Sequence, residues 1–302
     1  MRAARLTRIT EAFAMVVAMV VALVSCGRPG REVTTYGRAV SVWRDGAYLD
    51  ASESQRADVY VPRDQLSPPP LVVFVHGGGW MDLTKDDALV TVSSYLAAGW
   101  AVANVEYRRG REAAAPAAAA DVRCAIKWVV RHAADFGVDA TRLVLAGESA
   151  GAHLVMLAAF ADSTAGLDAA CEGPMPPVGG IVNWMGIADV NDLLSGANAR
   201  GWATGWIGQA VGGAKRARLL SPLRWVRPGL PPVISVHGDR DATVPFDHAR
   251  RLHAALSRAG VANELVILPG ADHGPLTPGA TAVARGAIMR FLAARAVPSR
   301  VK

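Results

Sequence analysis

Short runs of apolar residues recur along the chain, with longer amphipathic stretches between them. Unbroken apolar runs of about five residues are typical of strands that are buried on both faces of a parallel sheet. Residues 71–75 fit that description, and the pattern recurs, with one polar residue in each segment, at residues 100–105, 142–146, 180–184, 232–236 and 264–268. Another segment, residues 57–61, alternates apolar and polar positions and predicts an edge strand that Pro62 ends.

Helical periodicity fills the segments between these runs. It predicts helices at residues 86–98, 117–136, 150–161, 247–259 and 280–296. Strands that alternate with helices imply crossover connections, so the chain is predicted to be an α/β protein with a doubly wound, mostly parallel sheet. In such sheets functional residues gather at the carboxyl ends of the strands.

The first 26 residues have the pattern of a targeting signal. Arg2, Arg5 and Arg8 precede an apolar run at residues 12–24 that is too short to span a bilayer comfortably. The run ends in Leu-Val-Ser-Cys at residues 23–26, which resembles a bacterial lipobox, where cleavage before the cysteine exposes a thiol that receives lipid.

These features predict a signal peptide at residues 1–25, a lipidated Cys26 with a tether to residue 39, and one domain at residues 40–302. An ordinary secretory peptide cut nearby and a membrane-spanning anchor are the alternatives. All three interpretations place the domain outside the cytoplasm, and the first anchors it to the cell membrane as a lipoprotein.

Composition and charge limit the classes of protein to consider. With 51% hydrophobic residues in 302, the chain has enough apolar surface to fold, which excludes a disordered protein. Three arginines and one glutamate lie in residues 1–25, so the net charge of +6 falls to +4 without them. The remaining basic residues form no run interleaved with aromatics, so nucleic acid is not an expected partner.

Two cysteines remain in the predicted domain, Cys124 and Cys171. In an oxidising compartment they either form a disulfide or stay free, and the sequence leaves both outcomes open. No Cys-x-x-Cys or His-x-x-x-His pair is present, so no metal site is predicted.

One five-residue motif contains the candidate catalytic nucleophile. Gly-Glu-Ser-Ala-Gly at residues 147–151 follows the predicted strand at 142–146 and opens the helix at 150–161. Gly-x-Ser-x-Gly between a strand and a helix is a nucleophile elbow, whose tight turn projects the serine from the edge of the sheet. Ser149 is therefore the candidate nucleophile, and it needs a base because a serine hydroxyl is a weak nucleophile.

An acid and a base are expected after the serine, in that order. Asp241 lies beyond the predicted strand at 232–236 and His273 beyond the last strand, so both are expected at the edge where Ser149 projects. Asp239 is interpreted as a turn-forming carboxylate, and His237 as a group that supports the site from the end of its strand.

A glycine-rich turn supplies the third part of the expected site. His-Gly-Gly-Gly-Trp at residues 76–80 follows the strand at 71–75. Glycines let backbone N–H groups approach a ligand closely. The N–H groups of Gly77, Gly78 and Ala150 are therefore the candidates for an oxyanion hole, which stabilises the tetrahedral intermediate of acyl transfer.

With these motifs, the chain resembles the α/β-hydrolase superfamily over residues 57–296. Within it, the chain is similar to hormone-sensitive-lipase-like and bacterial feruloyl/acetyl-xylan-esterase-like carboxylesterases. The resemblance implies Ser149 as nucleophile, His273 as base and Asp241 as the residue that orients the base. It also implies that the three backbone groups just named hold the oxyanion.

The segment 185–228 separates two predicted strands and is the expected cap over the site. It is rich in glycine and carries Trp202 and Trp206, which suit a mobile cover over an acyl or sugar-bearing group. Together with Trp80 and Glu148, they are the candidate substrate-binding residues. The alternative is that the tryptophans of this segment pack it onto the sheet.

The sequence thus predicts a serine carboxylesterase that acts on small or medium acyl esters through an acyl-enzyme, without metal or organic cofactor. Ala152 and His153 follow the motif where many lipase-like relatives have a second glycine. That variant also resembles kynurenine formamidases and isoprenylcysteine methylesterases. An arylformamidase- or peptidase-type amide hydrolase is therefore one alternative, and a catalytically silent surface-binding protein is the other. Acyl preference and oligomeric state stay open.

Overall fold

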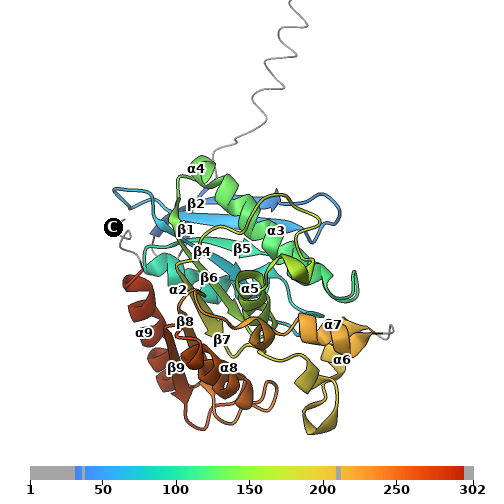
Figure 1. Ribbon diagram of the computed structural model, residues 1–302. Helices are drawn as coiled ribbons and strands as arrows, with labels where there is room; N and C mark the ends of the chain where they lie inside the picture. The colour runs from blue at the N-terminus through green and yellow to red at the C-terminus, as the bar shows by residue number, and fades with distance from the viewer. Residues whose placement is uncertain (1–30, 36–37, 209–211, 296–302) are drawn as a thin grey trace, which may run out of the picture.

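The computed structural model describes residues 31–35, 38–208 and 212–295. One nine-stranded sheet crosses it in the order β1-β2-β3-β5-β4-β6-β7-β8-β9 (Figure 1). The strands are β1 (Arg31–Thr35), β2 (Arg38–Ala47), β3 (Arg56–Pro62), β4 (Pro70–Val75), β5 (Ala101–Val105), β6 (Asp139–Glu148), β7 (Gly180–Trp184), β8 (Val233–Gly238) and β9 (Asn263–Leu268).

The six neighbouring strands β5, β4, β6, β7, β8 and β9 run parallel to one another. β1, β2 and β3 form an antiparallel meander, and β3 joins β5 antiparallel. Every residue of β4 and of β8 is buried, which explains why β4 is an unbroken apolar run and why β8 is apolar apart from Ser235 and His237. The prediction of a doubly wound, mostly parallel sheet is confirmed.

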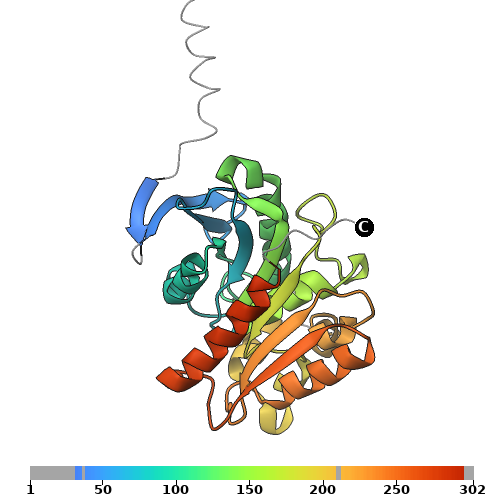
Figure 2. The same cartoon turned by 90° about the vertical axis from the view of Figure 1, so that its left-hand side faces the viewer.

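Helices cover both faces of this sheet. α3, α5 and α8 pack on one face, and α2 and α9 pack on the other (Figure 2). The helices are α2 (Leu89–Ala97), α3 (Ala117–Arg131), α4 (Ala133–Phe136), α5 (Ala150–Phe160), α6 (Gly201–Ile207), α7 (Gly213–Leu219), α8 (Asp247–Arg258) and α9 (Pro278–Ala293). Short 3-10 helices are η1 (Lys85–Ala88), η2 (Ser163–Ala165), η3 (Asn191–Leu193), η4 (Gly196–Asn198) and η5 (Pro222–Trp225).

The N-terminal part differs from the prediction in two respects. Residues 31–35 and 38–39, which were predicted as tether, are strand residues of the hairpin β1–β2. Because β2 also pairs with β3, the strand predicted at the edge is internal. The hairpin was missed because polar residues interrupt its apolar ones, such as the buried Val40 and Val42, and an antiparallel strand near a sheet edge does not require an apolar run.

Residues 1–25 and Cys26, the predicted leader and lipidation site, lie outside the described residues. Across the residues that the structure does describe, no helix is both long enough and apolar enough to cross a membrane.

Cys124 on α3 and Cys171 form a disulfide, with their Cα atoms 5.5 Å apart. An ionic cluster lies beside the bond. Asp168 accepts hydrogen bonds from the Arg123 guanidinium at 2.8 and 2.9 Å and from Lys127 Nζ at 2.6 Å. The bond and the cluster together attach the loop after η2 to α3.

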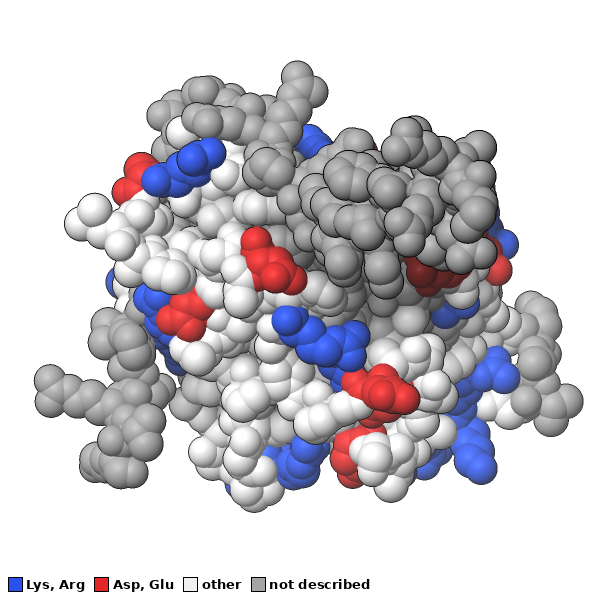
Figure 3. Space-filling model, turned by 90° about the horizontal axis from the view of Figure 1, so that it is seen from above, with Lys and Arg blue, Asp and Glu red and all other residues white. Residues whose placement is uncertain are grey.

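Charged side chains are interspersed on the face of the molecule shown in Figure 3, where Lys and Arg lie among Asp and Glu. No continuous basic patch is visible on that face. The prediction that nucleic acid is not a partner stays a prediction.

Candidate active site

Ser149 lies in the sharp turn between β6 and α5. Its φ of 53° and ψ of −117° are rare for a residue other than glycine. A Cβ on Gly147 would lie 2.5 Å from the carbonyl carbon of Gly151, and a Cβ on Gly151 would lie 2.0 Å from the carbonyl oxygen of Val75. Both flanking positions therefore require glycine, and the turn places Ser149 at the carboxyl edge of the sheet.

Two further side chains reach Ser149 from the loops that follow β8 and β9. His273 Nε2 lies 2.9 Å from Ser149 Oγ, and His273 Nδ1 lies 2.7 Å from Asp241 Oδ2. A carboxylate only accepts hydrogen bonds, so Nδ1 carries the proton and Nε2 is free to accept one from the serine hydroxyl. Loops far apart in the sequence thus bring together the three residues predicted to carry the chemistry.

The surroundings of Asp241 keep its carboxyl ionised. Oδ1 accepts the backbone N–H groups of Thr243 at 2.9 Å and Val244 at 2.7 Å, and His237 Nε2 lies 3.2 Å from Oδ2. Burial by itself raises the pKa of Asp241, but the hydrogen bonds from His237, His273 and Val244 outweigh that effect and hold this pKa well below its ordinary value. Asp241 is therefore a carboxylate at neutral pH.

The neighbouring carboxylates hold loops in place. Asp239 Oδ1 accepts the N–H of Gly270 at 2.6 Å, and Asp272 Oδ1 accepts the N–H of Ala242 at 2.8 Å. Neither makes a hydrogen bond to the imidazole of His273.

The glycine turn after β4 runs directly against Ser149. A Cβ on Gly77 would lie 3.3 Å from the Cβ of Ser149. Gly78 has a φ of +99°, and its carbonyl oxygen accepts the N–H groups of Met81 and Asp82, both at 3.0 Å. The N–H of Ala150 belongs to the first turn of α5, where helical N–H groups have no partner within the helix. Gly77 and Gly78 line the same cavity as Ser149, and Ala150 follows the serine directly, whereas their role as oxyanion donors stays a prediction.

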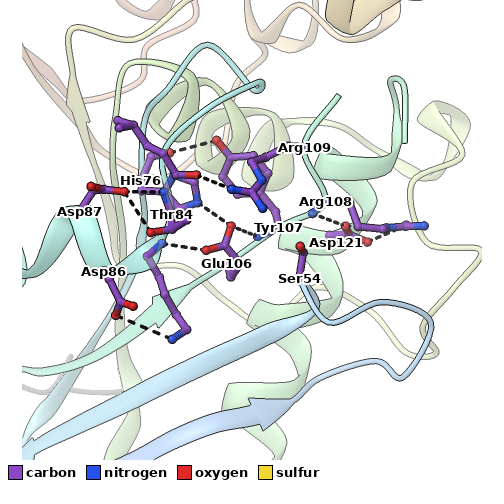
Figure 4. Close-up of polar contacts among 12 residues, drawn as sticks. Ser54, His76, Thr84, Asp86, Asp87, Glu106, Tyr107, Arg108, Arg109 and Asp121 are labelled. Carbon is purple, nitrogen blue, oxygen red and sulfur yellow. Dashed lines mark hydrogen bonds and ion pairs between the residues drawn. The ribbon is translucent and has the colours of Figure 1, made fainter. Parts of the chain in front are cut away.

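A buried polar cluster supports this glycine turn from behind (Figure 4). The Tyr107 hydroxyl donates to the carbonyl of Gly77 at 2.9 Å, and its ring stacks on His76 at 4.4 Å between centroids. His76 Nε2 lies 3.1 Å from Glu106 Oε1, and Glu106 Oε2 accepts the N–H of Lys85 at 2.8 Å. Burial raises the pKa of Tyr107, so its hydroxyl stays a donor. These contacts fix the position of the glycine turn.

A cavity of about 740 Å³ opens above Ser149 and His273. Glu148 and Trp202 line it, and their contact with a substrate stays a prediction. Burial raises the pKa of Glu148 above its ordinary value, although Thr91 Oγ1 donates a hydrogen bond to it at 2.7 Å. Further lining residues include Val90, Thr91, Trp184, Met185, Leu276, Thr281 and Arg285.

Two of the four predicted substrate-binding residues are wrong. Trp80 and Trp206 are fully buried and stack on each other, with ring centroids 4.1 Å apart and an interplanar angle of 14°. Trp80 Nε1 donates to His153 Nδ1 at 3.2 Å, and His153 Nε2 contacts the carbonyl of Leu220 at 2.7 Å. These rings therefore attach the segment 185–228 to the serine turn and the glycine turn, so they cannot line the cavity.

Several lining residues were missed, among them Met185, Thr91 and Arg285. Met185 follows β7, and the rule that sites form at the carboxyl ends of parallel strands points to its position. Thr91 and Arg285 lie on predicted helices, but the helix face that turns toward a site depends on packing that the sequence does not display.

Among residues 31–35, 38–208 and 212–295, no group of three or more His, Cys, Asp or Glu side chains is arranged to hold a metal ion. The expectation that neither metal nor organic cofactor takes part stays a prediction.

The chain is similar to families and proteins that are already known. The model of the BD-FAE family matches residues 57–256, and the model of the TAP-like protein family matches residues 215–302. Esterase LipQ of Mycobacterium tuberculosis is 29% identical over 70% of the chain and 52% of LipQ. Esterase LipC of the same organism is 32% identical over 73% of the chain and 57% of LipC. The chain thus spans little more than half the length of these relatives.

Among solved structures, Thermogutta terrifontis esterase 2 phosphoramylated by tabun is similar with a TM-score of 0.68 and 25% sequence identity. The match covers 87% of this chain and 97% of that one.

Proposed function

The chain belongs to the BD-FAE family and has the α/β-hydrolase fold, and on this premise we propose that it is a serine carboxylesterase for small or medium acyl esters. The proposal rests on two hydrogen bonds of His273: its Nδ1 lies 2.7 Å from Asp241 Oδ2, and its Nε2 lies 2.9 Å from Ser149 Oγ. A nucleophile, a base and an orienting carboxylate in hydrogen-bond contact can perform acyl transfer.

The reaction begins when Ser149 Oγ attacks the ester carbonyl carbon while its proton passes to His273 Nε2. Asp241 stabilises the resulting imidazolium because its carboxylate accepts the Nδ1 hydrogen bond. The carbonyl oxygen becomes an oxyanion, which the N–H groups of Gly77, Gly78 and Ala150 hold. One such donor typically lowers the barrier by roughly 3 kcal/mol.

The intermediate collapses when His273 returns the proton to the leaving alkoxide, and the alcohol departs. A water molecule then takes the place of the alcohol. His273 removes its proton, the hydroxide oxygen attacks the acyl-enzyme, and the acid leaves as Ser149 regains its proton. Each proton that the base accepts is returned within the same half-reaction.

The substrate class is supported by the cavity. Its volume of about 740 Å³ suits a ligand of moderate size, and apolar side chains such as Trp184, Met185 and Trp202 line it beside the serine. Glu148 and Trp202 are the residues that we assign to substrate contact.

A series of p-nitrophenyl esters from acetate to decanoate tests this proposal, using the full-length chain and the Ser149→Ala variant. We expect turnover that depends on Ser149 and declines when the acyl chain outgrows the cavity. Faster Ser149-dependent cleavage of matched anilides or formamides would favour the amide hydrolase instead. A folded protein without Ser149-dependent cleavage of any of these would contradict hydrolase activity.

We propose further that the enzyme works outside the cytoplasm, anchored through lipid on Cys26. The apolar run at residues 12–24 before Leu-Val-Ser-Cys supports this location, and the Cys124–Cys171 disulfide suits an oxidising compartment. The Cys26→Ala variant should leave the detergent-extracted membrane fraction, or remain as an uncleaved precursor. Unchanged membrane association of a correctly processed Cys26→Ala protein would contradict lipidation.

A further inference from the structure

One cationic side chain in the cavity has no role in the mechanism above. Arg285 projects from α9 and lines the cavity together with Thr281 of the same helix. α2, which contributes Val90 and Thr91, covers the same face of the sheet as α9 (Figure 2). Arg285 is exposed, so a ligand in the cavity can reach it.

The charge of Arg285 is not neutralised by the protein. α9 contains no Asp or Glu, so the helix offers no partner one turn away. Within the part of the chain that the structure describes, Arg285 has no carboxylate within 4 Å. Arginines elsewhere do have such partners: Arg108 pairs with Asp121 at 2.7 Å. The N–H groups of Arg285 are therefore available to a ligand in the cavity.

Two carboxyl groups, those of Asp82 and Glu148, also line the cavity, but they do not cancel the attraction of Arg285 for an anionic ligand. Asp82 is paired with Arg111 at 3.1 Å. Burial raises the pKa of Glu148, and the hydrogen bond from Thr91 and the charges of His273, His76 and Arg285 offset this only in part. The repulsion that an anionic ligand would meet is therefore reduced. Arg285 and Glu148, the residue that precedes Ser149, line the same cavity.

We propose that Arg285 makes the enzyme selective for esters that carry a carboxylate at the end of their acyl or alcohol part. This inference rests on the proposed esterase function. The planar guanidinium can donate two parallel hydrogen bonds to a carboxylate, which gives direction as well as attraction. Trp184 and Leu276, which line the same cavity, offer apolar contacts to the hydrocarbon part of such an ester.

Two pairs of substrates separate the acyl from the alcohol side. The first pair is the p-nitrophenyl half-ester of glutaric acid and p-nitrophenyl valerate. The second pair is the acetate ester of 4-hydroxybutyric acid and butyl acetate. In each pair one compound carries a carboxylate and the other a methyl group, so the ratio of the two kcat/KM values isolates recognition of the charge.

The variants are Arg285→Gln, Arg285→Lys and Arg290→Gln. Arg290 is an exposed cation on the same helix that does not line the cavity, so its variant changes the net charge equally. We expect Arg285→Gln to lower the anionic-to-neutral ratio about tenfold in at least one pair, the effect typical of losing one charge-assisted contact. Arg285→Lys should keep part of the preference, and Arg290→Gln should keep all of it.

Hydrolysis of the neutral esters should stay within twofold in every variant, and salt should lower the wild-type ratio but not that of Arg285→Gln. An unchanged ratio in both pairs would overturn the inference. An equal loss on anionic and neutral esters would overturn it too, because Arg285 would then serve structure and not recognition. Absence of Ser149-dependent hydrolysis of the neutral esters by the wild type would instead contradict the proposed function.

Discussion

Two histidines close to Ser149 have different hydrogen-bond partners: His273 contacts a carboxylate, whereas His153 contacts an indole N–H and a backbone carbonyl. His273 Nδ1 donates a hydrogen bond to the carboxylate of Asp241, which orients the ring so that Nε2 can accept the serine proton. His153 is fully buried, and its Nδ1 accepts the Trp80 N–H, so its Nε2 carries the proton that the Leu220 carbonyl accepts. This geometry requires a neutral ring at His153, and burial lowers its pKa from 6.5 to about 4.

The neutral state of His153 predicts a loss of stability in mild acid. Below pH 6.5 the unfolded chain takes up a proton at His153, whereas the folded chain does not until about pH 4. The free energy of unfolding therefore decreases as the pH is lowered from 6.5 to 4. Between pH 7 and 4.5 this one residue should remove about 2 kcal/mol from the free energy of unfolding.

Urea unfolding at a series of pH values checks this prediction in the wild type and in His153→Gln. The variant should be less stable at pH 7, because it loses the bond to Trp80, but its stability should decline less steeply toward pH 4.5. Parallel curves for the two proteins would contradict a neutral, buried His153.

At the level of elements, the glycine turn between β4 and η1 leaves no room for a side chain at Gly78. A Cβ on Gly78 would lie 1.9 Å from the carbonyl oxygen of Asp82, at a φ of +99°. Gly78→Ala should therefore displace the predicted oxyanion donors and lower kcat about 100-fold, the typical effect of losing one donor.

Gly166→Ala is the matched control for Gly78→Ala. Gly166 also has a positive φ, +68°, but a Cβ there would meet nothing within 4 Å. Kinetic constants and melting temperatures of both variants should show lost activity for Gly78→Ala alone. Equal activity of the two variants would show that the turn does not position an oxyanion.

Elements that surround the site were predicted well from the sequence. β4 is buried on both faces, so it appears as an apolar run, and the turn at Ser149 is marked by two glycines that steric contact requires. The hairpin β1–β2 has no such signature. The misassigned Trp80 and the missed Arg285 share one cause, because the direction in which a side chain faces depends on which distant element packs against it.

For the whole molecule, the disulfide links two segments that lie 47 residues apart in sequence. Neither Cys124 nor Cys171 lines the cavity. Replacing both by alanine should lower the free energy of unfolding by about 2–4 kcal/mol, the usual effect of removing a cross-link of this kind, and leave kcat/KM unchanged. Urea unfolding with and without a reductant is the measurement.

The reductant should destabilise the wild type and leave the double cysteine variant unaffected. Equal stability of the oxidised wild type and the variant would show that Asp168 and its two cations hold the loop without the bond.

Covalent labelling by a fluorophosphonate tests the central claim most directly, because it reports the nucleophile itself. Intact mass and peptide mapping should find one adduct per chain, on Ser149, and esterase activity should fall in proportion to labelling. Ser149→Ala should be neither labelled nor active, whereas Ser195→Ala, an exposed serine outside the cavity, should behave as the wild type does. Activity that persists in folded Ser149→Ala, or an adduct on another residue, would contradict the account.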